Sequence, residues 1–288
     1  MSYADLGIYE QNHKRIRVGN HELAYWQAGE GDDLLLIHGF PSAAWDWHPI
    51  WENLCQQYRV TAVDLLGFGL SDKPHPHRYQ VVEQADLVSE VLAKLGIEKL
   101  HVLAHDYGDS VAQAMLTLHS GEGAKLQIES VCFLNGGIFP HLHRPLLTQT
   151  LLKGMFGPLI AKGMGPSSLK KSFTRIFGDA TPPKENEIES LWQLLNTNQG
   201  KRVLPSLLTY IDERKAMGDV WTNTMKTCGI PLCFINGVQD PISGAHMADE
   251  FETLFTLQRL VRLDCGHYPQ LEMPDLVLQH YREFRATS

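Results

Sequence analysis

Short apolar runs that alternate with helical patterns are the feature that most constrains this chain. Residues 34–37 and 60–63 are strand-length, mostly apolar segments, whereas residues 81–95 carry an apolar residue every three or four positions. Unbroken apolar runs are typical of parallel strands covered on both faces, and the three-to-four spacing is typical of a helix. The repeated order predicts an open, doubly wound, mostly parallel α/β sheet. Further strands are expected at residues 100–104, 131–134, 232–235 and 260–263.

The remaining core elements follow from local signals. Residues 16–18 and 23–26 predict an antiparallel hairpin at the sheet edge. A helix is expected at residues 109–118, directly after a strand, and another begins at Pro274, because proline suits the first position of a helix.

One long segment interrupts the alternation. Between about Phe139 and Met225 there is no strand pattern, but helical patterns, prolines and glycines are frequent, and strands resume near Ile230. An insertion at the carboxyl ends of parallel strands lies over the ligand crevice. We therefore expect an α/β core formed by residues 1–136 and 226–288, with a helical lid, or cap domain, at 137–225.

Composition excludes several classes of protein. The chain has 288 residues, a net charge of −8, 43% hydrophobic and 20% charged residues, which is typical of a globular protein. Without a basic stripe, nucleic-acid binding is not expected. The first residues lack the apolar core of a signal peptide, and the longest apolar stretch, Pro145 to Met164, is broken by Lys153 and Lys162. We expect no stable membrane span and a cytoplasmic location.

The cysteines and histidines do not predict a metal site. The chain has five cysteines, an odd number, and no pair has the spacing of a metal site. Cys132 and Cys233 lie in apolar runs and are expected to be buried thiols. Cys265 is an alternative nucleophile, although its position suits a loop residue. No cofactor and no metal are expected.

Asp106 is the candidate nucleophile. It stands in Ala104-His-Asp-Tyr-Gly108, between a predicted strand and a predicted helix, with small residues two positions before and after it. This is the pattern of a nucleophile elbow, in which a sharp turn exposes the central residue. The alternative is a structural role, in which Asp106 only caps the helix.

Other polar residues follow the other strands. In His38-Gly-Phe-Pro41, the loop can aim the backbone amide of Phe40 at the reacting atom, and the Tyr107 amide would complete an oxyanion hole. Asp240 follows the fifth parallel strand and His267 follows the sixth. Each position alone is typical of a turn, but together they predict a triad of nucleophile, acid and histidine on one rim of the sheet.

These motifs resemble the α/β-hydrolase superfamily, in its branch of epoxide hydrolases and haloalkane dehalogenases. The resemblance covers nearly the whole chain and includes the segment from Asp64 to Asp72. Some relatives have the acid of the triad at the position of Asn135 in this chain. Because an amide cannot carry the negative charge of a carboxylate, Asp240 is favoured as the triad acid. The resemblance rests on the motifs His38-Gly-Phe-Pro, Asp64-Leu-Leu-Gly-Phe-Gly-Leu-Ser-Asp72, His105-Asp-Tyr-Gly, Gln239-Asp-Pro and His267-Tyr-Pro-Gln.

An aspartate nucleophile implies a covalent ester. A carboxylate is ionised at neutral pH without help from a base, so His267 is expected to act second. Neutral His267, oriented by Asp240, would take a proton from water, and the hydroxide would cleave the ester at Asp106.

The resemblance also bears on the leaving group. Epoxide hydrolases protonate the opening ring with two tyrosines of the lid, and Tyr210 occupies the position of one of them, with aromatic packing as the alternative role. The second tyrosine is absent, and His141 or His143 would replace it, unless both are surface histidines. Dehalogenases usually have Trp after the nucleophile and Asn or Glu in the oxyanion loop, whereas this chain has Tyr107 and Phe40.

The function we expect is that of an epoxide-hydrolase-like enzyme that adds water to a small apolar molecule. A haloalkane dehalogenase, or a lactone- or ester-cleaving relative, is the alternative that uses the same ester. A non-catalytic ligand-binding protein of this fold is the alternative from another class. The oligomeric state is left open. The residues expected to bind substrate are His38, Phe139, His141, His143 and Trp221.

Overall fold

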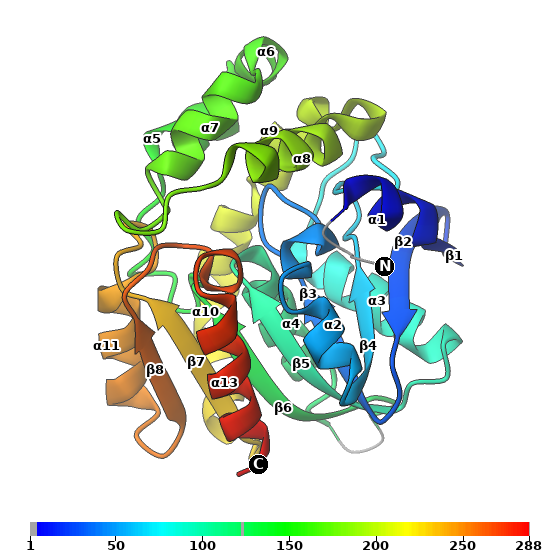
Figure 1. Ribbon diagram of the computed structural model, residues 1–288, viewed down its shortest axis with the longest axis vertical. Helices are drawn as coiled ribbons and strands as arrows, with labels where there is room; N and C mark the ends of the chain where they lie inside the picture. Colours follow the sequence, from blue (N-terminus) through cyan, green and yellow to red (C-terminus); the bar gives the residue numbers. More distant parts are fainter. Residues whose placement is uncertain (1–4, 122–123, 288) are drawn as a thin grey trace.

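The computed structural model describes residues 5–121 and 124–287 and contains one eight-stranded sheet in the order β1-β2-β4-β3-β5-β6-β7-β8 (Figure 1). The edge strands β1 and β2 form an antiparallel hairpin, β2 pairs antiparallel with β4, and the remaining neighbours are parallel. The predicted α/β fold class is thereby confirmed. The strands are β1 (Lys14–Val18), β2 (His21–Ala28), β3 (Asp32–Ile37), β4 (Tyr58–Val63), β5 (Lys99–His105), β6 (Gln127–Leu134), β7 (Leu232–Gly237) and β8 (Arg259–Leu263).

The central strands are buried on both faces, which explains why their sequences read as unbroken apolar runs. In β3, Leu35 pairs in register with Val102 of β5, and Val102 pairs with Val131 of β6. All three side chains are buried. Burying one such side chain stabilises the fold by about 1.5–3 kcal/mol.

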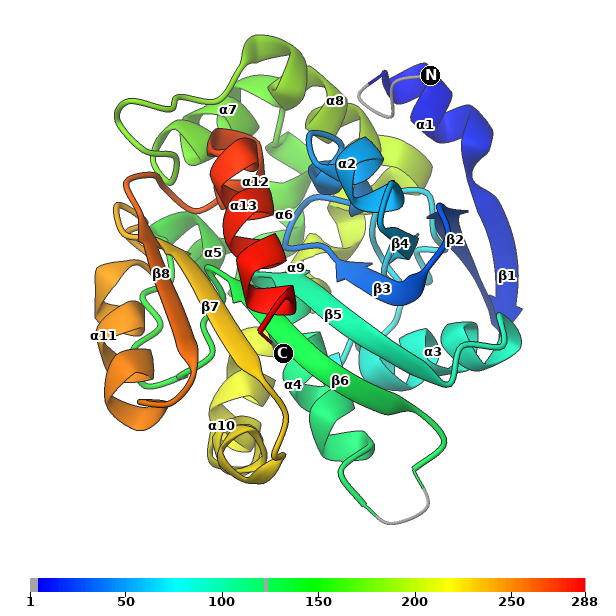
Figure 2. The same ribbon diagram turned by 60° about the horizontal axis from the view of Figure 1, so that its bottom comes forward.

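Helices cover the two faces of the sheet. The helices α3, α4 and α10 lie against one face, and α2 and α13 lie against the other (Figures 1 and 2). Gly96, at φ +70°, follows α3, in the left-handed conformation that commonly ends a helix. The helices outside the insertion are α1 (Leu6–Asn12), the 3-10 turn η1 (Ala44–Trp47), α2 (Trp51–Cys55), α3 (Val81–Lys94), α4 (Tyr107–Leu118), α11 (Ala245–Leu254), α12 (Pro269–Glu272) and α13 (Pro274–Arg285).

The segment between β6 and β7 is helical throughout its regular structure. Figure 1 shows α5 to α9 above the edge of the sheet at which β6 ends, whereas α10 runs back along the sheet and packs against α4. Because α10 joins the helical layer of the core, the division into a core and a lid at residues 137–225 stays a prediction. The helices of this insertion are α5 (Leu147–Lys153), α6 (Gly157–Gly163), α7 (Pro166–Thr174), α8 (Glu185–Asn196), η2 (Thr197–Val203), α9 (Leu204–Leu207) and α10 (Tyr210–Thr227).

Within the described ranges, no helix combines the length and the apolar character that a membrane crossing requires.

Candidate active site

Asp106 stands on a strained turn between β5 and α4. Its backbone has φ 47° and ψ −103°, a conformation that residues with a side chain rarely adopt. The turn is held because the Asp106 amide donates to the carbonyl of Leu134, at 3.0 Å. A Cβ at Gly108 would lie 2.4 Å from the carbonyl oxygen of Ile37, so this close approach of helix and strand requires glycine. The elbow therefore points one carboxylate away from the sheet.

The Phe40 amide contacts that carboxylate. The Phe40 N–H donates to Asp106 Oδ2 at 3.1 Å. Tyr107 is the first residue of α4, where an amide has no acceptor within the helix. The Phe40 amide thus reaches the carboxylate from the loop after β3. That the Tyr107 amide completes an oxyanion hole stays a prediction.

His38 holds the loop rather than the substrate. Its side chain is fully buried, Nδ1 donates to the carbonyl of Gly39 at 2.8 Å, and Nε2 accepts from the amide of Leu65 at 3.1 Å. Burial holds the pKa of His38 below its ordinary value, so the ring is neutral, as this pattern of one donor and one acceptor requires. His38 therefore fixes the conformation of the loop that presents the Phe40 amide.

His267 lies between two carboxylates. Its Nδ1 donates to Asp240 Oδ2 at 2.6 Å, and its Nε2 lies 3.9 Å from Asp106 Oδ1. The peptide backbone of His267 is also fixed, because buried His105 donates from Nε2 to the His267 carbonyl at 2.7 Å. The structure thus brings together the three residues that the sequence places at three strand ends.

Both carboxylate oxygens of Asp240 accept hydrogen bonds from neighbouring donors. Its Oδ1 accepts from the amide of Ile242 at 2.8 Å, and its Oδ2 accepts from the hydroxyl of Ser243 at 2.8 Å and from Asn135 Nδ2 at 3.1 Å. The Asn135 side chain also bonds to both backbone groups of Gly237. Sequence reasoning missed this supporting role of Asn135, although its position at the end of β6 was the available signal.

The three groups set one another's charge. Burial opposes ionisation of Asp106, but the interaction with the nearby ring of His267, followed by the charge of Arg214, holds its pKa well below the usual range. Burial also opposes the charge of His267, but Asp240 and Asp106 outweigh it and raise the pKa of His267 to about 10. The resting site is therefore an imidazolium between two carboxylates.

This charge state predicts a pH dependence of stability. The pKa of His267 is raised from the ordinary value of 6.5 to about 10, so its contribution is fully present below about pH 6.5 and is lost as the pH rises towards 10. We expect the melting temperature of the wild type to fall more steeply across this window than that of His267→Gln, measured by circular dichroism. Parallel curves for the two proteins would contradict the assignment.

Arg214 is a buried cation that the sequence did not reveal. Its side chain is 1% exposed, Nε donates to the Ser110 hydroxyl at 2.8 Å, and Nη2 donates to the Asp106 carbonyl at 3.4 Å. The guanidinium also lies over the ring of Tyr210, 4.7 Å from its centroid. Arg214 stands in the charged run Asp212-Glu-Arg-Lys215, and no role for it was predicted from the sequence.

Tyr210 packs against the oxyanion loop. It is fully buried, with its ring centroid 6.2 Å from that of Phe40 and 4.9 Å from that of Tyr107. Among the described residues, no group is hydrogen-bonded to its hydroxyl. Burial, followed by the negative charge of Asp106, holds the pKa of Tyr210 above its usual range. This protonated hydroxyl is a donor without an acceptor in the vicinity of Asp106.

His143 also faces this region, but as a neutral base. Its Nδ1 lies 3.3 Å from Arg214 Nη1, and its Nε2 is buried without a hydrogen-bond partner in the described part of the chain. Burial and, next, the charge of Arg214 lower the pKa of His143 to about 3.

Three of the expected substrate-binding residues lie elsewhere. The ring of Phe139 stacks on Phe255 with centroids 6.1 Å apart. The side chain of His141 is 64% exposed and lies 3.6 Å from Glu250, while Trp221 is buried in α10. None of the three lines the cavity that reaches His267. The sequence pattern of the insertion did not show which helical faces meet the core.

The cavity beside His267 is predominantly apolar. Its volume is about 260 Å³, and it extends from Phe40 and His267 towards α5, α6 and α7 of the insertion. Its size and its lining fit a small apolar molecule. The apolar side chains that line it include Pro41 and Ile242 of the core and Leu152, Leu169, Phe173, Ile176 and Leu204 of the insertion.

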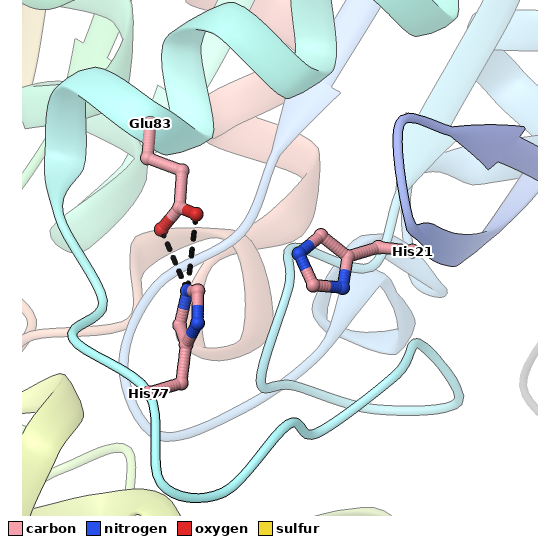
Figure 3. A group of neighbouring side chains, drawn as sticks. All are labelled: His21, His77 and Glu83. Atoms are coloured by element: carbon pink, nitrogen blue, oxygen red, sulfur yellow. Dashed lines mark hydrogen bonds and ion pairs between the residues drawn. The ribbon is translucent and has the colours of Figure 1, made fainter.

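A group of potential metal ligands lies apart from this site. In the described ranges, His21, His77 and Glu83 present ligand atoms within 4.8 Å of one another, at the β1–β2 edge of the sheet (Figure 3). His77 Nε2 lies 3.0 Å from both carboxylate oxygens of Glu83, so this pair satisfies itself by hydrogen bonding. Hydrogen bonding between His77 and Glu83 therefore explains the arrangement without a metal, and in the described part of the chain none of these three residues is hydrogen-bonded to Asp106.

A family model described as the alpha/beta hydrolase fold matches residues 33–274. The chain belongs to the α/β-hydrolase family. It is 41% identical over 268 residues to the mesoderm-specific transcript protein of Mus musculus, covering 89% of this chain and 79% of that protein. A soluble epoxide hydrolase of Corynebacterium sp. is 35% identical over 103 residues, which are 36% of each chain.

The structure of this α/β-hydrolase is also similar to that of the epoxide hydrolase CorEH, with a TM-score of 0.79 and 20% sequence identity over 96% of this chain and 98% of the other. At this identity the likeness shows the shared fold. The predicted resemblance to the superfamily is confirmed.

Proposed function

We propose that this α/β-hydrolase uses Asp106 as a nucleophile and passes through a covalent ester, and that its substrate is a small apolar epoxide. The observation that carries the proposal is the placement of the Asp106 carboxylate. It accepts from the Phe40 amide at 3.1 Å and lies 3.9 Å from His267 Nε2. A buried, ionised carboxylate between an amide donor and an imidazole is suited to nucleophilic attack followed by ester hydrolysis.

The first step forms the ester. A carboxylate oxygen of Asp106 attacks one carbon of the epoxide, and the carbon–oxygen bond of the ring breaks. The alkoxide takes the proton of the Tyr210 hydroxyl, and the imidazolium of His267 returns a proton to the tyrosinate through water. The buried Tyr210 hydroxyl without an acceptor supports this role.

Formation of the ester switches His267 from an acid to a base. The charge of Asp106 contributes to the raised pKa of His267, and the ester removes that charge. The pKa of His267 then falls, so the imidazole that has given up its proton stays neutral and can act as a base. Asp240 keeps Nδ1 protonated and leaves Nε2 free to accept.

The second step cleaves the ester. His267 takes a proton from water, and the hydroxide attacks the carbonyl carbon of the ester. The amides of Phe40 and Tyr107 stabilise the resulting oxyanion. Its collapse releases the diol and restores the Asp106 carboxylate and the His267 imidazolium.

Tyr210→Phe tests the assignment of the proton donor. We expect this variant to lower kcat for epoxides by about 10²- to 10⁴-fold, the usual contribution of a positioned acid. Opening of a β-lactone at its alkyl carbon should change little, because this attack also forms an Asp106 ester and the departing carboxylate needs no proton. Parallel kinetics with both substrate types provide the check, and equal losses on the two would assign Tyr210 to packing.

A screen with epoxides, haloalkanes and β-lactones tests the proposed function directly. Diol formation supports the epoxide assignment, while halide release or lactone cleavage without diol formation replaces it with the corresponding alternative. Phe40 contributes only a backbone donor where dehalogenases supply a polar side chain, which favours the epoxide. If calorimetry shows binding of these compounds but no compound of the panel is turned over, the result would indicate the non-catalytic ligand-binding alternative.

A further inference from the structure

The outer end of the helical insertion exposes large apolar side chains. We define the insert tip as residues 147–175, which contain α5, α6 and α7; α6 is its outermost helix, at the top of Figure 1. In the turn from α5 to α6, Met155 is 86% exposed and Phe156 is 65% exposed, and Leu159 in α6 is 70% exposed. Exposed apolar patches of this kind mark interaction surfaces.

These side chains share a surface. Leu147 and Leu151 are four positions apart in α5 and are both exposed. Phe156, Leu159 and Ile160 are likewise exposed and follow the spacing of one helical face. Since α5 packs against α6, and Leu151 and Ile160 line the same cavity, the exposed apolar side chains of the two helices lie close together at the insert tip.

The insert tip is also the positively charged end of a negatively charged molecule. Residues 141–178 contain no aspartate or glutamate, although the chain has a net charge of −8. Among the described residues, no acidic side chain pairs with Lys162, Lys171 or Arg175, whereas Lys153 and Lys170 have partners. The basic residues of residues 141–178 are Arg144, Lys153, Lys162, Lys170, Lys171 and Arg175.

The cavity of the candidate site reaches this surface. Exposed Leu151 and Ile160, together with Lys171 and Arg175, line the same cavity as His267. An apolar molecule that leaves an apolar phase at the insert tip therefore meets a continuous path towards His267.

We propose that the insert tip docks on the surface of an anionic lipid bilayer. The apolar side chains enter the boundary between headgroups and acyl chains, and the unpaired cations lie against the anionic headgroups. Charge selects this occupant, because an apolar surface surrounded by cations complements an anionic interface. Docking would present the cavity to substrates dissolved in the bilayer. The proposal does not depend on the chemistry at Asp106, since docking uses other residues.

Co-sedimentation with vesicles tests the apolar contribution. The vesicles contain phosphatidylcholine alone or phosphatidylcholine mixed with phosphatidylglycerol. We expect binding to the mixed vesicles and a loss of affinity of more than about 10-fold in the triple variant Met155→Ser, Phe156→Ser and Leu159→Ser. The matched control is Leu118→Ser, Leu257→Ser and Leu276→Ser, because these leucines are exposed outside the insertion. Its affinity should equal that of the wild type.

A second set of variants tests the charge. Replacing Lys162, Lys171 and Arg175 with glutamine should weaken binding to the mixed vesicles by about 10- to 100-fold, and added salt should have the same direction of effect. The control replaces Arg17, Lys125 and Lys226, which are exposed elsewhere. Melting curves verify that each variant is folded.

Three outcomes would overturn the proposal. The first is wild-type protein that binds the mixed vesicles no better than phosphatidylcholine alone. The second is an equal loss of affinity in the tip variants and their controls. The third is a wild-type dimer in sedimentation velocity that the serine variant converts to a monomer without any vesicle binding, which would assign the surface to a second copy of this chain.

Discussion

Replacing Asp106 with alanine is expected to lower kcat by at least about 10⁴-fold on any substrate that the wild type turns over. The carboxylate supplies the electron pair that forms the ester, and nothing else in its position does so. Asp106 N–H and the two hole amides belong to the backbone, so the elbow itself is retained. Steady-state kinetics at a high enzyme concentration, with substrate in excess, detect the residual rate.

Asp109→Asn is the matched control for this variant. Asp109 is fully buried three positions further along the same elbow and helix. Burial, followed by the charge of Asp106, raises the pKa of its carboxyl well above the usual range, and asparagine keeps the shape of the side chain while removing its ability to ionise. We expect near-normal turnover. Full activity in Asp106→Ala would remove the aspartate mechanism altogether.

Replacing His267 with alanine is expected to stop the reaction after one chemical step. Asp106 still attacks, because it needs no base to be ionised, but no imidazole activates water for the hydrolysis. We expect kcat to fall by about 10³- to 10⁴-fold while intact-protein mass spectrometry shows a substrate adduct at up to one equivalent. Rapid mixing should show a burst of the first step.

The mass of the adduct identifies the leaving group. An epoxide or a lactone adds its whole mass to the enzyme, whereas a haloalkane adds its mass without the hydrogen halide. The double variant with Asp106→Ala should form no adduct, which excludes attachment to another side chain. An adduct that persists in the double variant, or one that maps to Cys265, would point to a different nucleophile.

The positions of the sheet and the triad could be predicted because they depend on local patterns. Apolar runs mark parallel strands, and polar residues directly after three such runs must share one rim of the sheet. Asp106, Asp240 and His267 therefore lie together although they are distant in sequence. The contact of the Phe40 amide with Asp106 could also be predicted, since the loop after β3 fixes that amide.

The contacts of the insertion could not be predicted in the same way. Arg214 stands in a run of charged residues on α10, a pattern that normally indicates solvent, yet α10 packs on α4 and buries it. Phe139 and His141 were expected at the substrate, but they lie beside Phe255 and Glu250. Helical spacing identifies an apolar face without showing which surface covers it. The apolar side chains of α5 and α6 also follow helical spacing, and several of them are exposed rather than packed against the core.

The most direct test of the central claim follows the oxygen atoms of one turnover. Enzyme in excess reacts once with its substrate in water enriched in heavy oxygen, and a peptide containing Asp106 is weighed after digestion. Hydrolysis of an Asp106 ester places the heavy atom in the Asp106 carboxylate and leaves the first product unlabelled. A labelled first product with an unlabelled Asp106 peptide would show that water attacks the substrate directly and would contradict the account.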